Sequence, residues 1–233
     1  MTNITVGIPT HNEENSILGT INSVINQVEV NIIQIIVVAS GCTDNTVSVI
    51  ESVLQRDNRI ELVIEKERKG KISALNIILE KAQGDIIFHT DGDVILNSEA
   101  IKKAVKYFDK YPNVSGVSGR PSVVKASPSL FYRWAKNTER ILIKKKIREF
   151  REGVFFHMCG YALAHRKESI DKLPYVKGAT DATMGKIIKN SGIVVYDPNI
   201  IGEVLFPRNI KDFINQKSRI RYGFLSLNLT AKS

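Results

Sequence analysis

The segment IIQIIVVA, at residues 32–39, is the part of the chain from which its architecture can be inferred. Seven of its eight residues are apolar, and six of these are β-branched. A strand that is apolar on both faces is typical of the centre of a parallel sheet, because helices cover such a sheet from both sides. The stretch therefore predicts an α/β fold built around this buried strand.

The segments around this strand alternate between strand-like and helix-like patterns. Short apolar runs alternate with stretches in which apolar residues recur at helical spacing, in the order 4–8, 17–28, 32–39, 47–54, 60–64, 71–82 and 85–90. This alternation specifies a largely parallel central sheet with helices on both faces. We expect a Rossmann-like α/β domain.

The second half of the chain is less regular. It predicts helices at 98–108, 133–151 and 210–222 and a strand at 193–196. Because no linker or repeat interrupts the sequence, we expect a single domain over residues 1–233, with residues 1–95 and 96–233 as two functional halves.

Length and composition exclude several protein classes. With 233 residues, 43% of them hydrophobic and 24% charged, the chain is neither a disordered tail nor a collagen-like repeat. Cys42 and Cys159 are too few for a disulfide framework or a four-cysteine zinc site, and we interpret them as free thiols. Neither a secretory signal nor a membrane-spanning run is evident, so we expect a cytoplasmic location.

The net charge of +9 is unevenly distributed. Residues 1–95 carry 7 Lys and Arg against 13 Asp and Glu, whereas residues 96–233 carry 26 against 11. The basic excess peaks at 133–151, where apolar residues are interleaved at near-helical spacing. Such a helix either packs one stripe on the core and solvates the other, or lies on an anionic membrane surface, here the inner face of the cell membrane. No nucleic-acid recognition motif accompanies the charge, so we do not expect nucleic acid as a partner.

Polar side chains follow three of the predicted strands directly. The segments are PTHNEE at 9–14, SGCTD at 40–44 and DGD at 91–93. Ligands of open parallel sheets bind at the carboxyl ends of the strands, so the chemistry is expected in these segments.

The third of these segments suggests a cation site. Gly92 allows a sharp turn, and the carboxylates of Asp91 and Asp93 then share one cleft. Oxygen ligands select a hard divalent cation, Mg²⁺ or Mn²⁺, which substrate phosphates commonly share. An ordinary acidic turn remains the alternative. The sequence contains neither the glycine fingerprint of dinucleotide binders nor a phosphate-binding loop that ends in Lys-Ser or Lys-Thr.

Several motifs together resemble those of the family 2 glycosyltransferases of GT-A fold. They are VGIPTHNEE at 6–14, VVASGCTDNT at 37–46, GKISALN at 70–76, HTDGDV at 89–94, FFHMCGYALAHR at 155–166, ATDAT at 179–183 and QKSRIRYG at 216–223. The last is similar to the Gln-x-x-Arg-Trp segment of the processive members. The resemblance covers nearly the whole chain, with the motifs in the family's order.

The resemblance implies a role for each of a set of residues. The nucleotide-sugar would contact Pro9, His11, Glu13, Ser40, Lys71, Asp91, Gln216, Arg219 and Arg221, and the metal would contact Asp91 and Asp93. Asp181 would be the general base for the acceptor hydroxyl, and Cys159 and Gly160 would belong to an acceptor-side loop. From the residues alone, Asp181 could instead cap a helix, His11 could be a turn residue, and the two arginines could be solvated.

The chain departs from the family pattern at three places. Ala39 and Ser40 stand where the family commonly has two aspartates, which leaves the donor base open. Thr180 replaces a frequent glutamate, and Ile220 replaces the tryptophan of Gln-x-x-Arg-Trp, which leaves processivity open.

We therefore expect a metal-dependent inverting glycosyltransferase. Its donor would be a UDP- or GDP-linked sugar, and its acceptor a saccharide or a lipid-linked saccharide. The alternatives are a sugar-nucleotide nucleotidyltransferase and a non-catalytic module that binds glycans or membranes. The turn Pro9-Thr10-His11 disfavours the nucleotidyltransferase, because that class needs a glycine-rich basic loop at this position.

Overall fold

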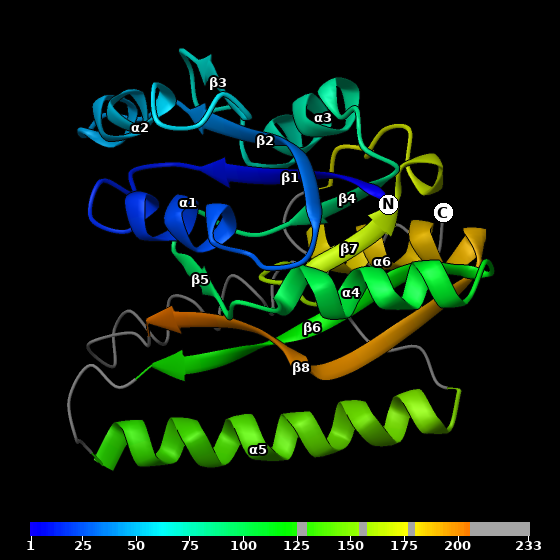
Figure 1. Cartoon of the computed structure of the whole chain (residues 1–233). Helices are drawn as coiled ribbons and strands as arrows, with labels where there is room; N and C mark the ends of the chain where they lie inside the picture. Colours follow the sequence, from blue (N-terminus) through cyan, green and yellow to red (C-terminus); the bar gives the residue numbers. More distant parts are fainter. Residues whose placement is uncertain (125–129, 154–157, 177–179, 206–233) are drawn as a thin grey trace.

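A computed structural model of the protein describes residues 1–124, 130–153, 158–176 and 180–205. In this part of the chain, eight strands form one sheet in the order β3-β2-β1-β4-β7-β6-β8-β5 (Figure 1). The strands are β1 (Asn3–Thr10), β2 (Asn31–Ser40), β3 (Ile60–Glu65), β4 (Ile86–His89), β5 (Val94–Leu96), β6 (Val114–Val124), β7 (Leu163–Arg166) and β8 (Ile193–Leu205). The helices are α1 (Ile17–Ile25), α2 (Thr46–Leu54), α3 (Lys71–Lys81), α4 (Ala100–Lys110), α5 (Leu130–Arg151) and α6 (Thr180–Ser191), with a short 3-10 helix, η1 (Lys167–Ser169).

Six of the eight strands run in the same direction. β1 is parallel to both β2 and β4, β2 to β3, and β6 to β8. β7 is antiparallel to both of its neighbours, β4 and β6, and β5 is antiparallel to β8. The expected α/β class with a largely parallel sheet is confirmed.

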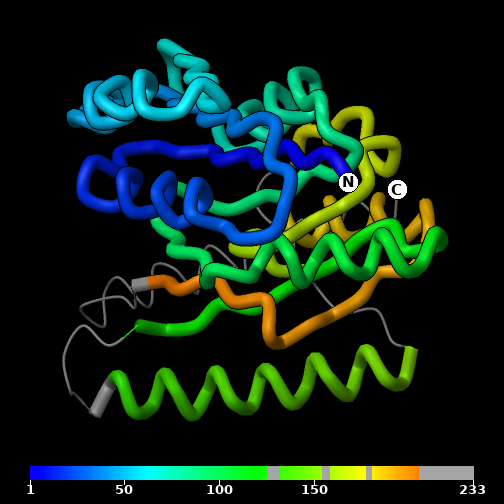
Figure 2. Tube along the Cα trace, in the orientation of Figure 1, coloured from blue at the N-terminus to red at the C-terminus, as the bar shows by residue number. Residues whose placement is uncertain are grey.

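The pleat of the central strand explains why helices cover both faces of the sheet. Ile35 and Val37 belong to a core cluster that includes residues of α1, α2 and α4, whereas Ile36 and Val38 pack with residues of α3 and α6. Successive side chains of a strand point to opposite faces, so an all-apolar strand needs a helix layer on each side. In Figure 2, α1 and α4 lie in front of the sheet and α6 lies behind it.

Strands β5, β6 and β7 were not predicted from the sequence. β5 and β7 span only 3 and 4 residues, and β6 contains Gly116, Gly119 and Pro121, which are depleted in strands. These segments become strands through pairing with distant parts of the chain. β8 is also longer than the predicted strand at 193–196, because its pairing with β6 continues from Val114 to Val124.

The first helix is shorter in the structure than the sequence predicts. α1 ends at Ile25, and Val28 is 42% exposed instead of extending the apolar face. The chain leaves the helix because the Gln27 side chain donates to the carbonyl oxygen of Asn97, and the backbone N–H of Val28 donates to that of Ser98. The predicted helices at 98–108 and 133–151 correspond to α4 and α5.

Three further expectations concern a helix near the end of the chain, membrane-spanning helices and the two cysteines. The predicted helix at 210–222 lies outside the described residues. Among the described helices, none combines the length and the apolar character that a bilayer crossing requires. Cys42 and Cys159 are both free thiols, as expected.

Candidate active site

The segments that follow β1, β2 and β4 meet at one edge of the sheet. The backbone N–H of Glu13, after β1, donates to Oγ1 of Thr46 at the start of α2, at 2.7 Å. Thr20 Oγ1 of α1 donates to the carbonyl oxygen of Gly92, after β4, at 2.9 Å. The predicted convergence of these segments is therefore found in the structure, and the loops are tied to one another by hydrogen bonds.

Lys71 lies between two carboxylates from different parts of the chain. Its Nζ is 2.7 Å from Oδ1 of Asp91, in the loop after β4, and 3.6 Å from Oδ1 of Asp181, in the first turn of α6. The three side chains are between 23% and 39% exposed, so the cluster is half-buried and still open to a ligand. Two of the predicted donor-binding residues and the predicted general base thus share one site.

The Asp181 carboxylate is oriented by the acceptor-side segment. Its Oδ2 accepts the backbone N–H of Gly160 at 3.1 Å. A Cβ atom at Gly160 would lie 2.4 Å from Asp181 Oδ1, so only glycine allows this close approach. The hydrogen bond and the Lys71 contact direct the carboxylate toward the cluster.

Carboxylates outnumber ammonium groups around Lys71 in the described part of the chain. Burial raises the pKa of Asp91 to about 6; Lys71 opposes this shift, and Asp181 and Asp93 add to it. Burial also disfavours the charged form of Lys71, but Asp181 and Asp91 outweigh it and hold the Lys71 pKa above its ordinary value. A single ammonium therefore serves several carboxylates.

Asp93 and Glu13 extend this negative region. Reduced hydration raises the pKa of Asp93. Burial raises the pKa of Glu13; the hydrogen bond from Ser16 opposes this shift, and the charges of Asp93 and Asp91 add to it. Burial is the main cause of both shifts, and only at Glu13 do neighbouring carboxylates add to it.

Gly92, between the two aspartates, is required by close packing. A Cβ atom at this position would lie 2.4 Å from Thr10 Oγ1. The turn therefore passes directly over the end of β1, and it carries Asp91 and Asp93 over the same edge of the sheet.

The ends of β1 and β2 form the side of the site that is predicted to bind the nucleoside. His11 Nδ1 lies 2.8 Å from the carbonyl oxygen of Ser40, and Pro9 is buried within β1. The Ser40 hydroxyl is buried and has no hydrogen-bond partner among the described residues. His11, Ser40 and Glu13 thus lie at one edge with Asp91, whereas Gln216, Arg219 and Arg221 lie outside the described residues.

The predicted acceptor-side segment is partly strand. Its first three residues, 155–157, lie outside the described residues, and its last four form β7. The backbone N–H of Cys159 donates to Ser118 Oγ at 2.9 Å, and burial raises the pKa of the Cys159 thiol to about 11. This thiol stays protonated at neutral pH and is unsuited to act as a nucleophile.

Tyr161 was missed as a candidate, although it directly follows Gly160. Its carbonyl oxygen accepts Thr90 Oγ1 at 3.1 Å, next to Asp91. Burial raises the pKa of the Tyr161 hydroxyl, and Asp91 adds to the shift, which places this side chain beside the acid cluster. The only sequence signal was its position next to the glycine.

A buried histidine pair supports the loop that carries Asp91, and it was also missed. His165 Nδ1 lies 2.7 Å from the carbonyl oxygen of Arg166 and therefore carries the proton. His165 Nε2 then accepts a hydrogen bond from His89 Nε2–H, at 3.0 Å. The pair joins β4 to β7 two residues before Asp91.

The site residues fit a divalent cation. Asp91 and Asp93 provide two carboxylates, and the raised pKa of each indicates that added positive charge would be stabilising. No group of three or more His, Cys, Asp and Glu side chains is arranged as a complete metal site within the described ranges. Proteins commonly hold Mg²⁺ or Mn²⁺ by one or two carboxylates while substrate phosphates complete the coordination, and Asp91 and Asp93 meet this requirement.

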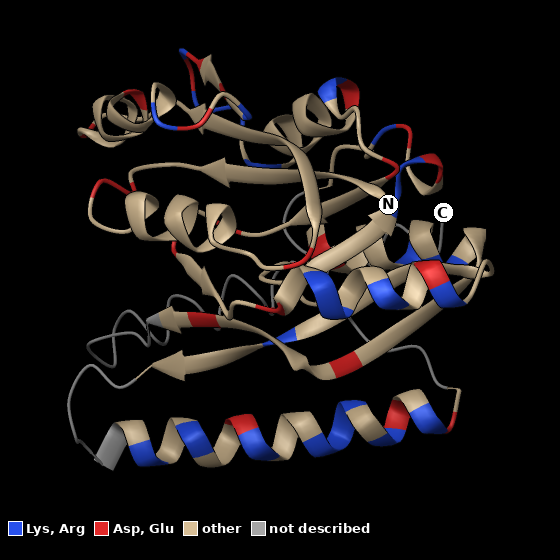
Figure 3. Cartoon of the chain, in the orientation of Figure 1, with Lys and Arg blue, Asp and Glu red and all other residues tan. Residues whose placement is uncertain are grey.

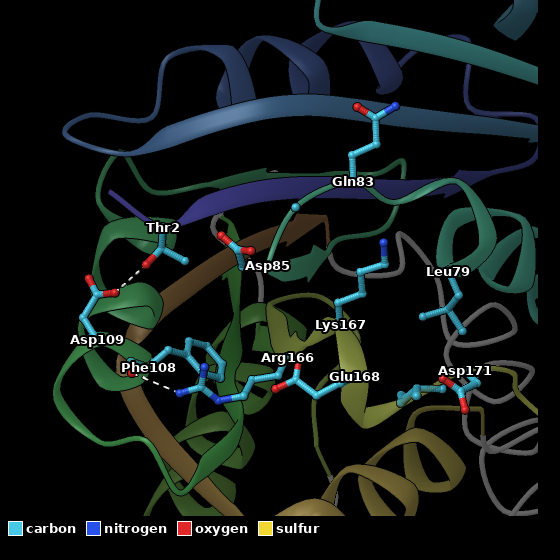
Figure 4. A pocket seen from close by; sticks show the side chains of 12 residues that line it. Thr2, Leu79, Gln83, Asp85, Phe108, Asp109, Arg166, Lys167, Glu168 and Asp171 are labelled. Carbon is cyan, nitrogen blue, oxygen red and sulfur yellow. Dashed lines mark hydrogen bonds between the residues drawn. The ribbon is translucent and has the colours of Figure 1, made fainter.

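A separate cavity of about 780 Å³ lies at the opposite edge of the sheet (Figure 4). It is lined by residues at the amino ends of β1 and β4, including Thr2 and Asp85, and by Arg166 at the end of β7. Arg166 donates to the carbonyl oxygens of Val114 and Phe108, so its guanidinium already has protein partners. The cavity is remote from the acid cluster.

Comparisons with known proteins agree with this arrangement. The family model described as Glycosyl transferase family 2 matches residues 5–173. An uncharacterized glycosyltransferase of Haemophilus influenzae is 32% identical over 104 residues, which are 45% of this chain and 41% of that protein. The chain thus matches about two fifths of the length of this curated relative.

Solved structures share the fold. The mannosyltransferase PcManGT from Pyrobaculum calidifontis, in complex with GDP-Man and Mn²⁺, aligns with a TM-score of 0.67 at 23% identity, over 89% of this chain and 58% of its own. The glucosyl-3-phosphoglycerate synthase from Mycobacterium tuberculosis, in complex with Mn²⁺, UDP and glucosyl-3-phosphoglycerate, aligns with a TM-score of 0.66 at 20% identity, over 97% and 79%. These neighbours are GT-A glycosyltransferases. With the family model covering more than half of the residues, the chain belongs to the family 2 glycosyltransferases.

Proposed function

We propose that this protein is a metal-dependent, inverting glycosyltransferase that moves a sugar from a UDP- or GDP-linked donor to an acceptor hydroxyl. The observation that carries the proposal is the single cluster of Asp91, Lys71 and Asp181 at the carboxyl edge of the sheet. Together with the neighbouring Asp93, it would supply a cation for the phosphates, a pair of carboxylates for the metal and a further carboxylate, Asp181, to accept a proton.

The donor would bind with its nucleoside at the ends of β1 and β2. Pro9, His11 and Glu13 would line this side, and the Ser40 hydroxyl, which has no partner within the described ranges, offers a hydrogen bond to the base or the ribose. The Lys71 ammonium, which contacts Asp91 and lies near Asp181, would then bind the diphosphate in place of Asp91. Gln216, Arg219 and Arg221 remain proposed diphosphate contacts.

Asp91 and Asp93 would hold Mg²⁺ or Mn²⁺ on the donor diphosphate. When bound, the cation supplies charge neutralisation for the departing nucleoside diphosphate. Two of the similar solved structures are complexes with Mn²⁺, which supports this assignment by analogy.

Asp181 would accept the proton of the acceptor hydroxyl. As the acceptor oxygen forms its bond to the anomeric carbon, the bond from that carbon to the diphosphate oxygen breaks, and the configuration inverts. The Gly160 N–H fixes one carboxylate oxygen of Asp181, and the other faces the site. Cys159 and Gly160 would border the acceptor, for which we propose a saccharide or a lipid-linked saccharide.

The test is transfer from a panel of UDP- and GDP-sugars, with and without Mn²⁺, in the wild-type chain, in Asp181→Asn and in Asp171→Asn. Asp171 is an exposed aspartate that lines the cavity at the opposite edge and serves as the matched control. We expect Asp181→Asn to lower transfer roughly 100- to 10,000-fold while donor binding persists, and Asp171→Asn to leave both unchanged. Loss of donor binding in Asp181→Asn would instead indicate a structural carboxylate. Glycan binding without any nucleotide binding would favour the non-catalytic module.

A further inference from the structure

Helix α5 has an inner face that is firmly anchored to the sheet. Ala135 is 3% exposed, and Glu139 forms ion pairs with Arg120 of β6 at 2.8 Å and with Lys136 at 2.9 Å. Farther along, the Lys146 ammonium lies 5.5 Å from the centre of the Tyr196 ring of β8. These contacts fix which side of α5 faces away from the protein.

The outer face of α5 presents two large apolar side chains, Trp134, which is 47% exposed, and Ile141, which is 67% exposed. They are separated by about two helical turns and therefore lie on the same side of the helix. Leu142 is 49% exposed, but it follows Ala135 by the same interval and therefore lies toward the inner side. Isolated apolar residues on a surface are ordinary, but two large ones aligned on one helix face form a small patch.

This patch is surrounded by positive charge. Exposed basic side chains accompany it along the helix: Arg133, Arg140, Lys144, Lys145, Arg148 and Arg151. Of the two glutamates in α5, Glu139 belongs to the inner face, and Glu149 lies 3.6 Å from Lys145. Figure 3 shows the resulting density of basic residues along α5, and in Figure 1 the helix runs along the bottom edge of the molecule, beyond β6 and β8.

We propose that the outer face of α5, defined by Trp134, Ile141 and the six basic residues, binds peripherally to an anionic lipid bilayer. The cations are attracted to anionic headgroups, and the apolar side chains enter the boundary between headgroups and acyl chains. A nucleic acid would use the charge but offers no apolar layer for Trp134 and Ile141. A helix face that is only solvated gains no stability from exposing these two side chains.

The proposal is independent of the glycosyl-transfer chemistry, because α5 contributes none of the acid-cluster residues. It assigns to the protein a membrane-facing side formed by the outer face of α5. An acceptor that is attached to a lipid would then be encountered by a protein already held at the same surface.

The experiment is vesicle flotation of the full chain with phosphatidylcholine vesicles that contain or lack phosphatidylglycerol. Binding is expected only with the anionic vesicles at low salt (about 0.05 M NaCl) and is expected to weaken strongly at about 0.5 M NaCl, where charges are screened over a few ångströms. Trp134 is the only tryptophan of the chain, so its emission reports the proposed contact directly. We expect a blue shift with anionic vesicles and quenching by brominated lipid.

Two matched double variants test whether α5 is the lipid-binding surface. Lys144→Gln/Lys145→Gln removes two charges from the outer face of α5, and Lys106→Gln/Lys110→Gln removes two exposed lysines from α4. The first should weaken binding roughly 10- to 30-fold, and the second by less than about twofold. Transfer to a water-soluble acceptor, if the proposed function holds, should be unchanged in both.

Three results would overturn the proposal. One is absence of flotation with anionic vesicles at low salt, and another is equal weakening by both lysine pairs. The third is flotation without any change in Trp134 emission. Tight binding of a duplex RNA with no vesicle binding would assign the basic surface to nucleic acid instead.

Discussion

The backbone N–H of Gly160 donates a hydrogen bond to Oδ2 of Asp181, at 3.1 Å, across 21 residues of sequence. The space where a side chain at residue 160 would begin is filled by the Asp181 carboxylate itself. The direction of the proposed base is therefore set by a backbone group and by the absence of a Cβ atom. This relationship links the acceptor-side segment to α6.

Replacing Gly160 by alanine should move the Asp181 carboxylate without unfolding the protein. The new Cβ would lie 2.4 Å from Asp181 Oδ1, and the half-exposed carboxylate can rotate away. We expect transfer to fall by roughly 100-fold, because small displacements of a reacting group are costly, while donor affinity changes little. Steady-state kinetics, nucleotide calorimetry and thermal unfolding together measure this. In an Asp181→Asn background, the same change should cost almost nothing further; a full additional loss there would contradict the coupling.

Lys71→Met should weaken nucleotide binding. The variant removes an ammonium that lies 2.7 Å from Asp91, and with it a charge-assisted hydrogen bond to the proposed diphosphate. We expect the affinity for UDP or GDP to fall roughly 10- to 100-fold, as measured by calorimetry with Mn²⁺ present. Lys81→Met is the control, because Lys81 is at the other end of α3 and pairs with Glu61. Equal weakening in both variants would show that Lys71 acts only through helix stability.

Asp93→Asn should weaken binding of the divalent cation. The variant removes one of two carboxylates at the proposed metal position while keeping the size of the side chain. We expect Mn²⁺ affinity, followed by the electron paramagnetic resonance of the free ion, to fall at least roughly tenfold, both with and without nucleotide. Asp171→Asn should leave it unchanged. Unaltered Mn²⁺ binding in Asp93→Asn would remove this residue from the metal site.

We expect the buried histidine pair to make the free energy of unfolding depend on pH in the acid range. Burial lowers the pKa of His165 to about 4, from an ordinary value of 6.5. The unfolded chain therefore binds more protons than the native protein between these values, so the stability from neutral His165 is fully present above pH 6.5 and is lost as the pH falls toward 4. One group with this shift contributes about 3 kcal/mol.

His165→Gln isolates this contribution. Glutamine can donate to the Arg166 carbonyl oxygen and accept from His89, but it does not titrate. The free energy of unfolding, measured by urea denaturation from pH 7.5 to 4.5, should fall less steeply with pH in the variant than in the wild type. Burial also raises the pKa of Asp91 to about 6, which has the opposite sign, but this contribution is common to both proteins and cancels in the comparison. Parallel pH profiles would mean that His165 is not neutral in the native state.

Much of the fold was predictable, because the decisive patterns are local. The period of apolar residues gave the order of strands and helices through β4, and the run at 32–39 identified the strand that is covered on both faces. β6 escaped prediction because its residues have weak strand propensity, and its conformation comes from pairing with β7 and β8.

The candidate site, like the fold, was predictable only in part. That Asp91 and Asp93 follow a buried strand could be predicted, because the burial pattern of a strand and the turn after it are encoded in neighbouring residues. The position of Lys71 between Asp91 and Asp181 could not, because these residues are 20 and 110 positions away in the chain. That placement, and the raised pKa of Asp91 that results from the site, depend on packing between α3, β4 and α6 and on the low hydration of the cluster. Contacts across such separations are fixed by the packing of whole elements, which no local pattern specifies.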